Sequence, residues 1–297
     1  MRVFLTGASG FIGSAIIEQL KAGGHEVLGL ARNDDNAGKL QAAGVAVHRG
    51  DVTEPKTLAA GAAACDATIH CAFIHDFSKF VENIAIDRRA VETMLAAMEG
   101  SGKPFILTSG TLMADADREA TEEDGPSTEG AGAMRGATEL VAQDYAGRGV
   151  RAMIVRLPQV HDTWKQGLIT YAIEVAREKG VSAYVGDGSA RWAAAHVSDV
   201  ARLYRLALEN GQAGARYHAV GESGVSMRDI AQALGRRLKL PVVSITPEEA
   251  PAHFGFLAMF ANRDAPTSSR LTQERLNWTP TGPTLIEDLD ALQFAGA

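Results

Sequence analysis

A glycine-rich turn near the N-terminus constrains the fold of this 297-residue chain more than any other feature. A β-rich run at residues 3–6 leads into Gly7-Ala8-Ser9-Gly10-Phe11-Ile12-Gly13, and apolar residues then recur at helical spacing. Such a turn lets a pyrophosphate approach the backbone closely, and the helix N-terminus offers unpaired N–H groups. A turn without a ligand is the alternative, but it is less consistent with the strand before and the helix after. The pattern therefore predicts dinucleotide-binding residues, namely Gly7, Ser9, Gly10, Phe11, Ile12 and Gly13.

The alternation of β-rich runs with helical stretches indicates the fold class. The runs lie at residues 3–6, 26–31, 45–49, 67–71, 105–108 and 152–156. Parallel strands that are joined by right-handed crossovers carry helices on both faces of their sheet. The sequence therefore predicts an α/β fold in which residues 1–160 form a Rossmann domain with a doubly wound parallel sheet.

Beyond Leu157-Pro158 this alternation loosens. Helical patterns at residues 168–179, 200–209, 227–238 and 285–292 are separated by breaks with glycine or proline. They predict a smaller C-terminal substrate-binding domain over residues 161–297, with a segment near 191–220 returning to the Rossmann core. The polar stretch 121–132 is interpreted as a loop, because a helical pattern resumes at Met134. One apolar cluster fits either an ordinary core or a wide substrate pocket: Phe254, Phe256, Leu257, Met259 and Phe260.

Composition and charge argue against several functions. Hydrophobic residues make up 46% and charged residues 22%, as in ordinary globular proteins, and the net charge of -7 argues against a nucleic-acid partner. The chain opens without a signal-like segment and has no apolar run of transmembrane length, so we expect a cytoplasmic protein without a membrane partner. The two cysteines, Cys65 and Cys71, are too few for a disulfide framework and lack metal-ligand spacing, so no metal is expected.

The residue after the second predicted strand bears on the choice of cofactor. Arg32 stands where an acidic residue would bind the adenosine ribose of NAD. Because a guanidinium pairs with a 2′-phosphate, Arg32 favours NADP(H); the alternative is a solvated charge at a strand end. Asp51 and Val52, after the third strand, are expected at the adenine edge, although Asp51 fits equally as the cap of a helix near Glu54.

Further motifs carry a family resemblance. His70-Cys71-Ala72 ends the fourth predicted strand, Thr108-Ser109-Gly110 the fifth, and Arg156-Leu157-Pro158 the sixth. Together with the glycine-rich turn they resemble the extended and atypical branches of the short-chain dehydrogenase/reductase superfamily. The resemblance covers most of the chain, and it implies that four residues after these strands lie at the cofactor: Cys71, Ala72, Phe73 and Pro158.

The resemblance also reveals missing parts. In such relatives a serine after the fifth strand holds the substrate oxygen, a tyrosine transfers the proton, and a lysine four residues later binds the ribose. Here Ser109 is retained, but alignment on Glu139 puts Ala131 at the tyrosine position and Arg135 at the lysine position. No Tyr-x-x-x-Lys occurs in the chain, and Asp87 takes the place of the family's active-site Asn. In lacking this Tyr and Lys, the chain resembles the simocyclinone-type polyketide ketoreductases. Arg135 is expected to hold the ribose or an anionic substrate.

Reduction of a ketone needs a hydride and a proton, so the proton source is open. The candidates on the protein are Ser109 or Thr111 with a water, and the histidines His161 and His196. Each has a structural alternative: Ser109 as a loop contact, His161 as a surface residue, and His196 as a structural histidine before a helix. A third source is an acidic hydroxyl beside the carbonyl of the substrate itself, as in an aromatic polyketide.

These features favour an NADPH-dependent ketoreductase of antibiotic biosynthesis, acting on a bulky, hydrophobic, aromatic or polyketide-type small molecule. A sugar-nucleotide epimerase or dehydratase is one alternative, but such enzymes use the missing tyrosine and prefer NAD. A non-catalytic NADP-binding sensor is the other, and the loss of the acid favours it whereas the retained Ser109 does not.

Overall fold

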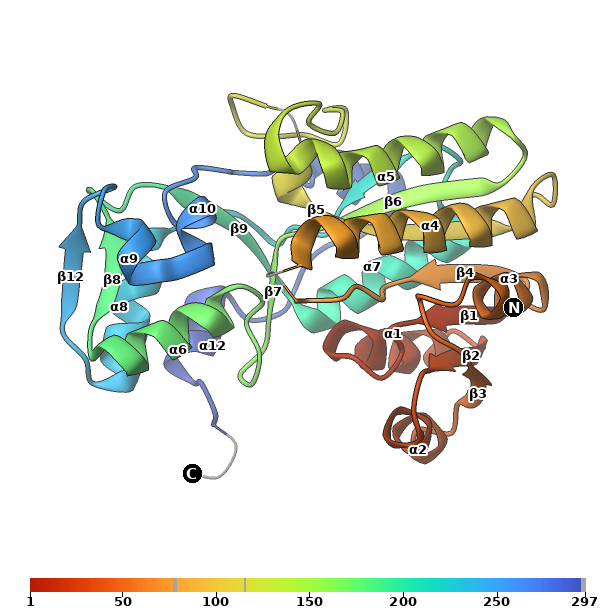
Figure 1. Ribbon diagram of the computed structural model, residues 1–297, viewed down its shortest axis with the longest axis horizontal. Coiled ribbons are helices and arrows are strands. Elements are labelled where there is room, and N and C mark those ends of the chain that lie inside the picture. Colours follow the sequence, from red (N-terminus) through yellow and green to blue (C-terminus); the bar gives the residue numbers. More distant parts are fainter. Residues whose placement is uncertain (77–78, 115, 295–297) are drawn as a thin grey trace.

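A seven-stranded parallel sheet forms the centre of the molecule (Figure 1), which is a computed structural model describing residues 1–76, 79–114 and 116–294. Of residues 130–132 only the backbone is described. The strands follow the order β10-β6-β5-β4-β1-β2-β3 and each pairs in parallel with its neighbours. Their bounds are β1 (Arg2–Thr6), β2 (Glu26–Ala31), β3 (Ala46–Arg49), β4 (Ala67–His70), β5 (Pro104–Gly110), β6 (Arg151–Leu157) and β10 (Arg216–His218). The predicted doubly wound α/β fold is confirmed.

Helices cover both faces of this sheet (Figure 1). On one face α1 (Phe11–Ala22) packs against α7 (Val197–Asn210); on the other lie α3 (Pro55–Ala63), α4 (Phe80–Met98) and α5 (Gly130–Gly147). A further helix, α2 (Asp34–Ala42), joins β2 to β3. Because side chains alternate along a strand, Val3 and Leu5 enter one core cluster and Phe4 enters the other.

The rest of the chain builds a second layer of structure beside the sheet (Figure 1). Three strands, β7 (Gln159–His161), β9 (Arg191–His196) and β11 (Glu222–Ser226), form one small sheet, and β8 (Ser182–Val185) pairs with β12 (Val242–Ile245). Helices accompany them: α6 (Ile169–Lys179), α8 (Met227–Leu238), α9 (Ala250–Phe254), α10 (Ala258–Ala261) and α12 (Leu285–Asp290). A further helix, α11 (Arg270–Leu276), packs against α7 and β10. Between β9 and β11, α7 and β10 return to the main sheet; the domain boundary near residue 160 stays a prediction.

Two sequence interpretations change in this part of the chain. Helix α5 begins at Gly130, four residues before the predicted start at Met134. The end of the stretch 121–132, which was interpreted as a loop, therefore forms the first turn of this helix. In the apolar cluster, Phe254 and Leu257 are buried in a core with Val185, whereas Met259 is 60% exposed. The ordinary-core interpretation therefore fits the two buried members.

Buried polar groups join segments that are far apart in the sequence. Arg156 on β6 and Glu139 on α5 form a fully buried pair, with Nη2 to Oε2 at 2.6 Å and Nε to Oε1 at 3.0 Å. Glu122 Oε1 accepts from both the backbone N–H and the hydroxyl of Thr272, each at 2.6 Å. His218 lies between Arg156, 3.4 Å away, and the Ser268 carbonyl, 2.8 Å away. Burial and the nearby Arg156 cation lower the pKa of His218 to about 4.

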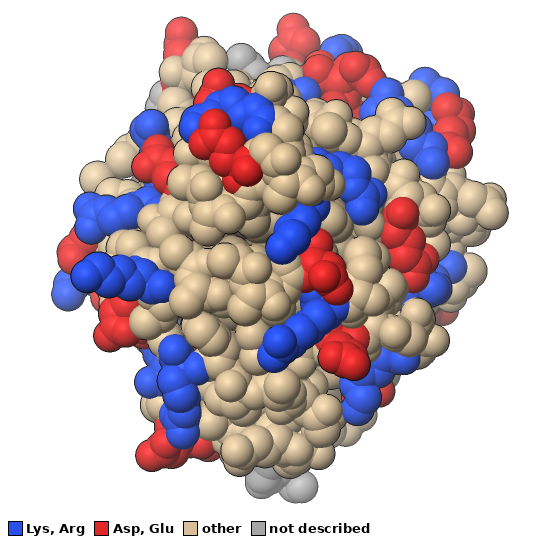
Figure 2. All heavy atoms as spheres, turned by 90° about the vertical axis from the view of Figure 1, so that its right-hand side faces the viewer, with Lys and Arg blue, Asp and Glu red and all other residues tan. Residues whose placement is uncertain are grey.

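The charged surface is mixed where Figure 2 shows it. On the face that looks out from the right-hand side of Figure 1, acidic and basic side chains are interspersed. Within the described ranges, none of the helices is both long enough and apolar enough to cross a bilayer.

Candidate functional site

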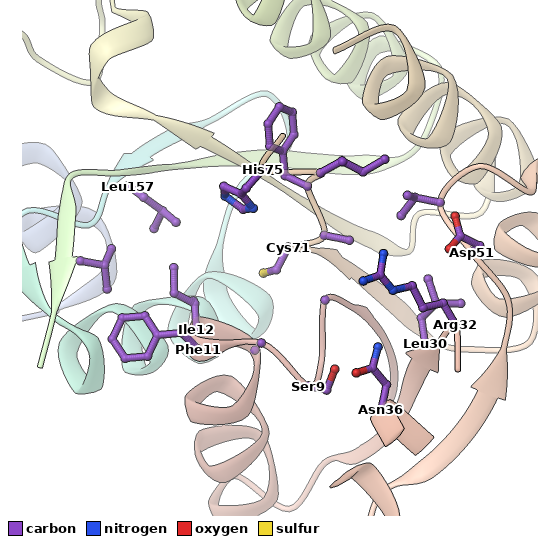
Figure 3. A pocket seen from close by; sticks show the side chains of 18 of the residues that line it. Ser9, Phe11, Ile12, Leu30, Arg32, Asn36, Asp51, Cys71, His75 and Leu157 are labelled. Carbon is purple, nitrogen blue, oxygen red and sulfur yellow. The ribbon is translucent and has the colours of Figure 1, made fainter. Parts of the chain in front are cut away.

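A pocket of about 680 Å³ opens at the carboxyl ends of the parallel strands (Figure 3). Ligands of open α/β sheets bind at this edge. Its lining comes from the turn after β1, the ends of β2, β3, β4 and β6, and the loop before α6: Gly7, Ser9, Gly10, Phe11, Ile12, Gly13, Leu30, Arg32, Asn36, Gly50, Asp51, Val52, Cys71, Ala72, Phe73, Ile74, His75, Leu157, Pro158, Val160 and Gly167.

The glycine-rich turn is shaped for close backbone approach. Gly7 has φ +68°, and a Cβ on it would lie 2.8 Å from the Ala72 nitrogen. A Cβ on Gly13 would lie 2.2 Å from the Gly7 carbonyl oxygen, so the first turn of α1 packs directly on the loop. Gly10 occupies the N-cap of α1 without a side-chain cap, which leaves helix N–H groups for an anion. These residues fit the pyrophosphate of a dinucleotide.

One end of the pocket, the polar end, is formed by Arg32, Asn36 and Asp51 (Figure 3). Arg32 is exposed and has no ion pair or hydrogen bond with any described residue, whereas the nearby Arg49 pairs with Asp34 at 2.5 Å. An unpaired guanidinium here fits a 2′-phosphate.

Asp51 does not cap the next helix, so that alternative is wrong. Its Oδ1 accepts from the backbone N–H and the hydroxyl of Thr53, both at 2.8 Å, and Glu54 occupies the N-cap of α3. Asp51 instead shapes the turn after β3 and lines the pocket.

The opposite end, the apolar end, includes Phe11, Ile12 and Leu157, and Figure 3 shows His75 on this side. Residues 71–73 line the pocket between the two ends. A series of buried, hydrogen-bonded side chains supports this loop. Thr6 Oγ1 lies 2.7 Å from His70 Nδ1 and accepts from the Ala72 N–H at 3.2 Å. His70 Nε2 lies 3.2 Å from Asp87 Oδ1 on α4. The Asp predicted at the family's Asn position therefore lies buried under the loop.

Cys71 also contacts the α7 side of the sheet. The Thr108 hydroxyl lies 3.2 Å from Cys71 Sγ and 2.7 Å from the Tyr204 hydroxyl. Burial raises the pKa of Cys71 to about 11, and burial also raises the pKa of Tyr204. Both groups therefore stay protonated near neutral pH, and Tyr204 forms part of the core rather than the pocket wall.

The predicted catalytic hydroxyls lie outside the pocket wall. Ser109 and Thr111 are buried, the latter at the start of a short 3₁₀ helix, η2 (Thr111–Met113). Since Thr108 faces α7, Ser109 points to the other face of the sheet, and its Oγ has no hydrogen-bond partner in the part of the chain that the structure describes. Ser109 thus keeps a hydroxyl without a described partner on the α4 and α5 side of the sheet, and its catalytic role stays a prediction.

The two candidate histidines face away from the pocket. His161 Nδ1 lies 2.6 Å from Asp288 Oδ2, and its side chain is fully buried, so the surface alternative for His161 is wrong. His196 accepts from the Ser198 N–H and caps α7. Because Val160 lines the pocket, the next side chain on β7 points to the opposite side. The structural alternative describes the contacts of His196, and its role as a proton donor stays a prediction.

Arg135 reaches the edge of the pocket through an aromatic contact. Its Cζ lies 4.0 Å from the centre of the Phe73 ring, which in turn meets the His75 ring edge-on with centres 5.4 Å apart. Ala131, at the tyrosine position, lies in α5, where only the backbone is described.

The predicted turn, strand-end and loop residues share one pocket, but the sequence reasoning missed several others. Asn36 lies in the first turn of α2, which follows directly on the predicted Arg32, so its nearness to Arg32 in the sequence offered a signal. Gly50, Leu157 and Val160 adjoin the predicted residues Asp51 and Pro158 in the motifs after β3 and β6. No comparable signal marked the remaining lining residues: Leu30, Ile74, His75 and Gly167.

Comparisons with known proteins agree with this architecture. The NAD dependent epimerase/dehydratase family matches residues 3–220. An uncharacterized protein of Saccharomyces cerevisiae is 45% identical, over 98% of each chain. The 4-hydroxy-2-methyl-3-oxo-4-farnesyl-3,4-dihydroquinoline-1-oxide ketoreductase of Stigmatella aurantiaca is 26% identical, over 86% of this chain and 80% of its own. A dTDP-glucose 4,6-dehydratase of Streptomyces venezuelae with NAD bound shares the fold, with a TM-score of 0.78 at 22% identity over 98% and 95% of the two chains.

Proposed function

Because the chain belongs to the NAD dependent epimerase/dehydratase family, we propose that it is an NADPH-dependent ketoreductase of a bulky, hydrophobic carbonyl compound. The observation that carries this proposal is the pocket itself. It joins a glycine-rich turn and an unpaired Arg32 at one end to an apolar wall at the other. When bound there, NADPH would supply the hydride for the carbonyl carbon.

The polar end supports NADPH over NADH. Arg32 lines the pocket without an acidic partner among the described residues, and the one carboxylate among the described lining residues, Asp51, is engaged by Thr53. A 2′-phosphate would therefore meet a free guanidinium at this end.

The apolar end supports a hydrophobic carbonyl substrate. Phe11, Ile12 and Leu157 give it walls suited to a ring system. The Stigmatella relative, a ketoreductase, acts on a ring that bears a 3-oxo group, a 4-hydroxy group and a farnesyl chain. That substrate and the resemblance to simocyclinone-type enzymes support an aromatic or polyketide-type ketone for this chain.

The proton source is best assigned to the substrate. The chain has no Tyr-x-x-x-Lys, Ser109 is buried and does not line the pocket, and His196 caps a helix. A phenol adjacent to the ketone would already be hydrogen-bonded to the carbonyl oxygen, so the proton has only a short distance to move.

The experiment that tests the function compares matched ketones. NADPH oxidation is followed with 2′-hydroxyacetophenone, 2′-methoxyacetophenone and larger aryl ketones of both kinds. We expect turnover with the ketones that carry a free phenol and little with their methyl ethers. Tight binding of NADPH without turnover of any ketone would contradict the reductase and leave a non-catalytic NADP-binding sensor.

A further inference from the structure

The loop after β4 contributes three residues to the pocket lining, Cys71, Ala72 and Phe73, and Figure 3 shows Cys71 between the two ends of the pocket. This loop lies directly against the glycine-rich turn. A Cβ on Gly7 would stand 2.8 Å from the Ala72 nitrogen and 2.8 Å from the Cys71 carbonyl carbon. The position of the Ala72 amide therefore sets how closely the loop approaches the turn, and the two segments together form this part of the pocket wall.

The Ala72 amide is bound to a series of three side chains that ends on α4. Its N–H donates to Thr6 Oγ1 at 3.2 Å, and Thr6 Oγ1 lies 2.7 Å from His70 Nδ1. His70 Nε2 lies 3.2 Å from Asp87 Oδ1. Thr6, His70 and Asp87 are 0%, 1% and 7% exposed, so bulk water does not compete for these bonds. We call these three side chains the support series.

The chemistry of the support series fixes which group donates at each step. A carboxylate oxygen accepts, so Nε2 of His70 carries the proton that is shared with Asp87. Nδ1 of the neutral ring is then an acceptor and takes the Thr6 hydroxyl proton, which leaves lone pairs of Thr6 Oγ1 for the Ala72 N–H. Without the carboxylate, the ring can carry its proton on Nδ1, and the Thr6 hydroxyl loses its acceptor.

From this order of donors we propose that Asp87 is a positioning residue for the cofactor: through His70 and Thr6 it keeps residues 71–73 in the shape that binds NADPH. The inference rests on the proposed function, because it takes NADPH as the ligand of the pocket. Asp87 is not among the described residues that line the pocket, so it acts through the support series and not by contact. The residue at the family's Asn position thus serves cofactor binding in this chain.

Two pairs of variants of the full chain test the support series. D87L and T6V keep the approximate shape of the side chain and remove the bonding atoms, whereas D87N keeps an acceptor oxygen and T6S keeps the hydroxyl. We expect D87L and T6V each to raise the Kd of NADPH about tenfold, as the loss of one hydrogen bond does, and D87N and T6S to stay within about threefold of wild type. Titration of the NADPH fluorescence measures these constants.

The double variant D87L/T6V separates a series from two independent contacts. In a series, the loss of either member already releases the Ala72 amide, so the double variant should bind NADPH about tenfold more weakly than wild type, as each single variant does. Independent contributions would multiply to a loss of about a hundredfold and would overturn the inference.

T68V is the matched control. Thr68 is buried on β4, which pairs with β1, and its Oγ1 has no hydrogen-bond partner among the described residues. The same change of threonine to valine therefore removes no described hydrogen bond, and T68V should keep the NADPH affinity of wild type.

Hydrogen exchange of the Ala72 amide, measured without cofactor, reports on the loop itself. Exchange should be about tenfold faster in D87L and T6V than in wild type, and unchanged in T68V. Wild-type exchange in D87L, or faster exchange with unchanged NADPH affinity, overturns the inference and leaves the reductase in place. The expected exchange in a protein that binds no NADPH does the reverse: it keeps the support of the loop by Asp87 and rejects the proposed cofactor.

Discussion

The two ends of the pocket are built in different ways. The polar end and the glycine-rich turn come from one stretch of chain, residues 7–52, folded as consecutive strands and helices. The apolar end combines Phe11 and Ile12 of that turn with the loop after β4, the end of β6 and the loop before α6. Where consecutive strands and helices form a site, the spacing of residues in the sequence predicts which residues meet there. Where distant segments form it, the spacing does not.

The two regions also differ in what stabilises them. The turn depends on glycines that allow backbone to pack on backbone, as between Gly13 and Gly7. The end of β6 instead adjoins buried polar groups: Arg156, the residue before Leu157, pairs with Glu139 and lies beside His218. A buried polar group that loses its partner costs several kcal/mol, so this region is expected to respond to pH and the turn is not.

The largest expected effect is at the turn. G13A places a methyl group 2.2 Å from the Gly7 carbonyl oxygen, so the turn must move and NADPH affinity should fall about a hundredfold. Titration of the NADPH fluorescence measures this. G38A is the control, because a Cβ on Gly38 of α2 meets nothing within 4 Å and should stabilise the helix by about 1 kcal/mol. Wild-type affinity in G13A would mean that this packing does not shape the site.

The next effect is a pH dependence of stability in the second region. The pKa of His218 is about 4 in the folded chain against 6.5 as its ordinary value, so the unfolded chain binds the extra proton between these limits and stability rises with pH. Between about pH 5 and about pH 7 the free energy of unfolding should rise by about 2 kcal/mol more in wild type than in H218N. Urea unfolding at both pH values measures this difference. An equal rise of the free energy of unfolding with pH in the two proteins would rule out His218 as its source.

A smaller effect separates the two cofactors at the polar end. R32A should raise the Kd of NADPH about tenfold and leave that of NADH nearly unchanged, since Arg32 has no other described partner to lose. R49A is the control, because Arg49 is paired with Asp34 on the surface. An equal loss for both nucleotides in R32A would show that Arg32 does not read the 2′-phosphate.

The smallest effect is expected at Ser109. Its buried Oγ has no partner among the described atoms, so S109A should leave the free energy of unfolding unchanged or raise it by about 1 kcal/mol. S182A provides the contrast, because Ser182 Oγ donates to the Ala231 carbonyl at 2.8 Å and its loss should cost about 1 kcal/mol. A marked destabilisation by S109A would show that this hydroxyl has a structural partner.

Sequence alone predicted the central fold, and most of the residues that it assigned to the cofactor line one pocket. The β-rich runs at 3–6, 26–31 and 67–71 became β1, β2 and β4, because buried parallel strands are marked by local apolar composition. The pocket also brings together the turn residues and the strand-end residues, because they follow strands whose carboxyl ends meet at one edge: Gly7, Ser9, Gly10, Phe11, Ile12, Gly13, Arg32 and Asp51.

The position of a residue at a strand end did not predict the contacts of the two candidate histidines. His196 and His161 both end strands, as the pocket residues do, yet their strands, β9 and β7, belong to the small sheet and their side chains contact Ser198 and Asp288. Strand pairing and side-chain facing decided this, and neither is encoded in local spacing.

The sequence by itself determined the parallel-sheet fold, the position of the glycine-rich turn, the arginine after the second strand and the absence of a Tyr-x-x-x-Lys. These depend on residue type and on spacing within one strand–helix unit. Only the tertiary structure decided that Ser109 is buried outside the pocket lining, that His196 caps a helix, and that Arg135 stacks on Phe73 without a described polar partner. Such contacts arise between segments tens of residues apart, and their geometry is set by the packing of the whole core.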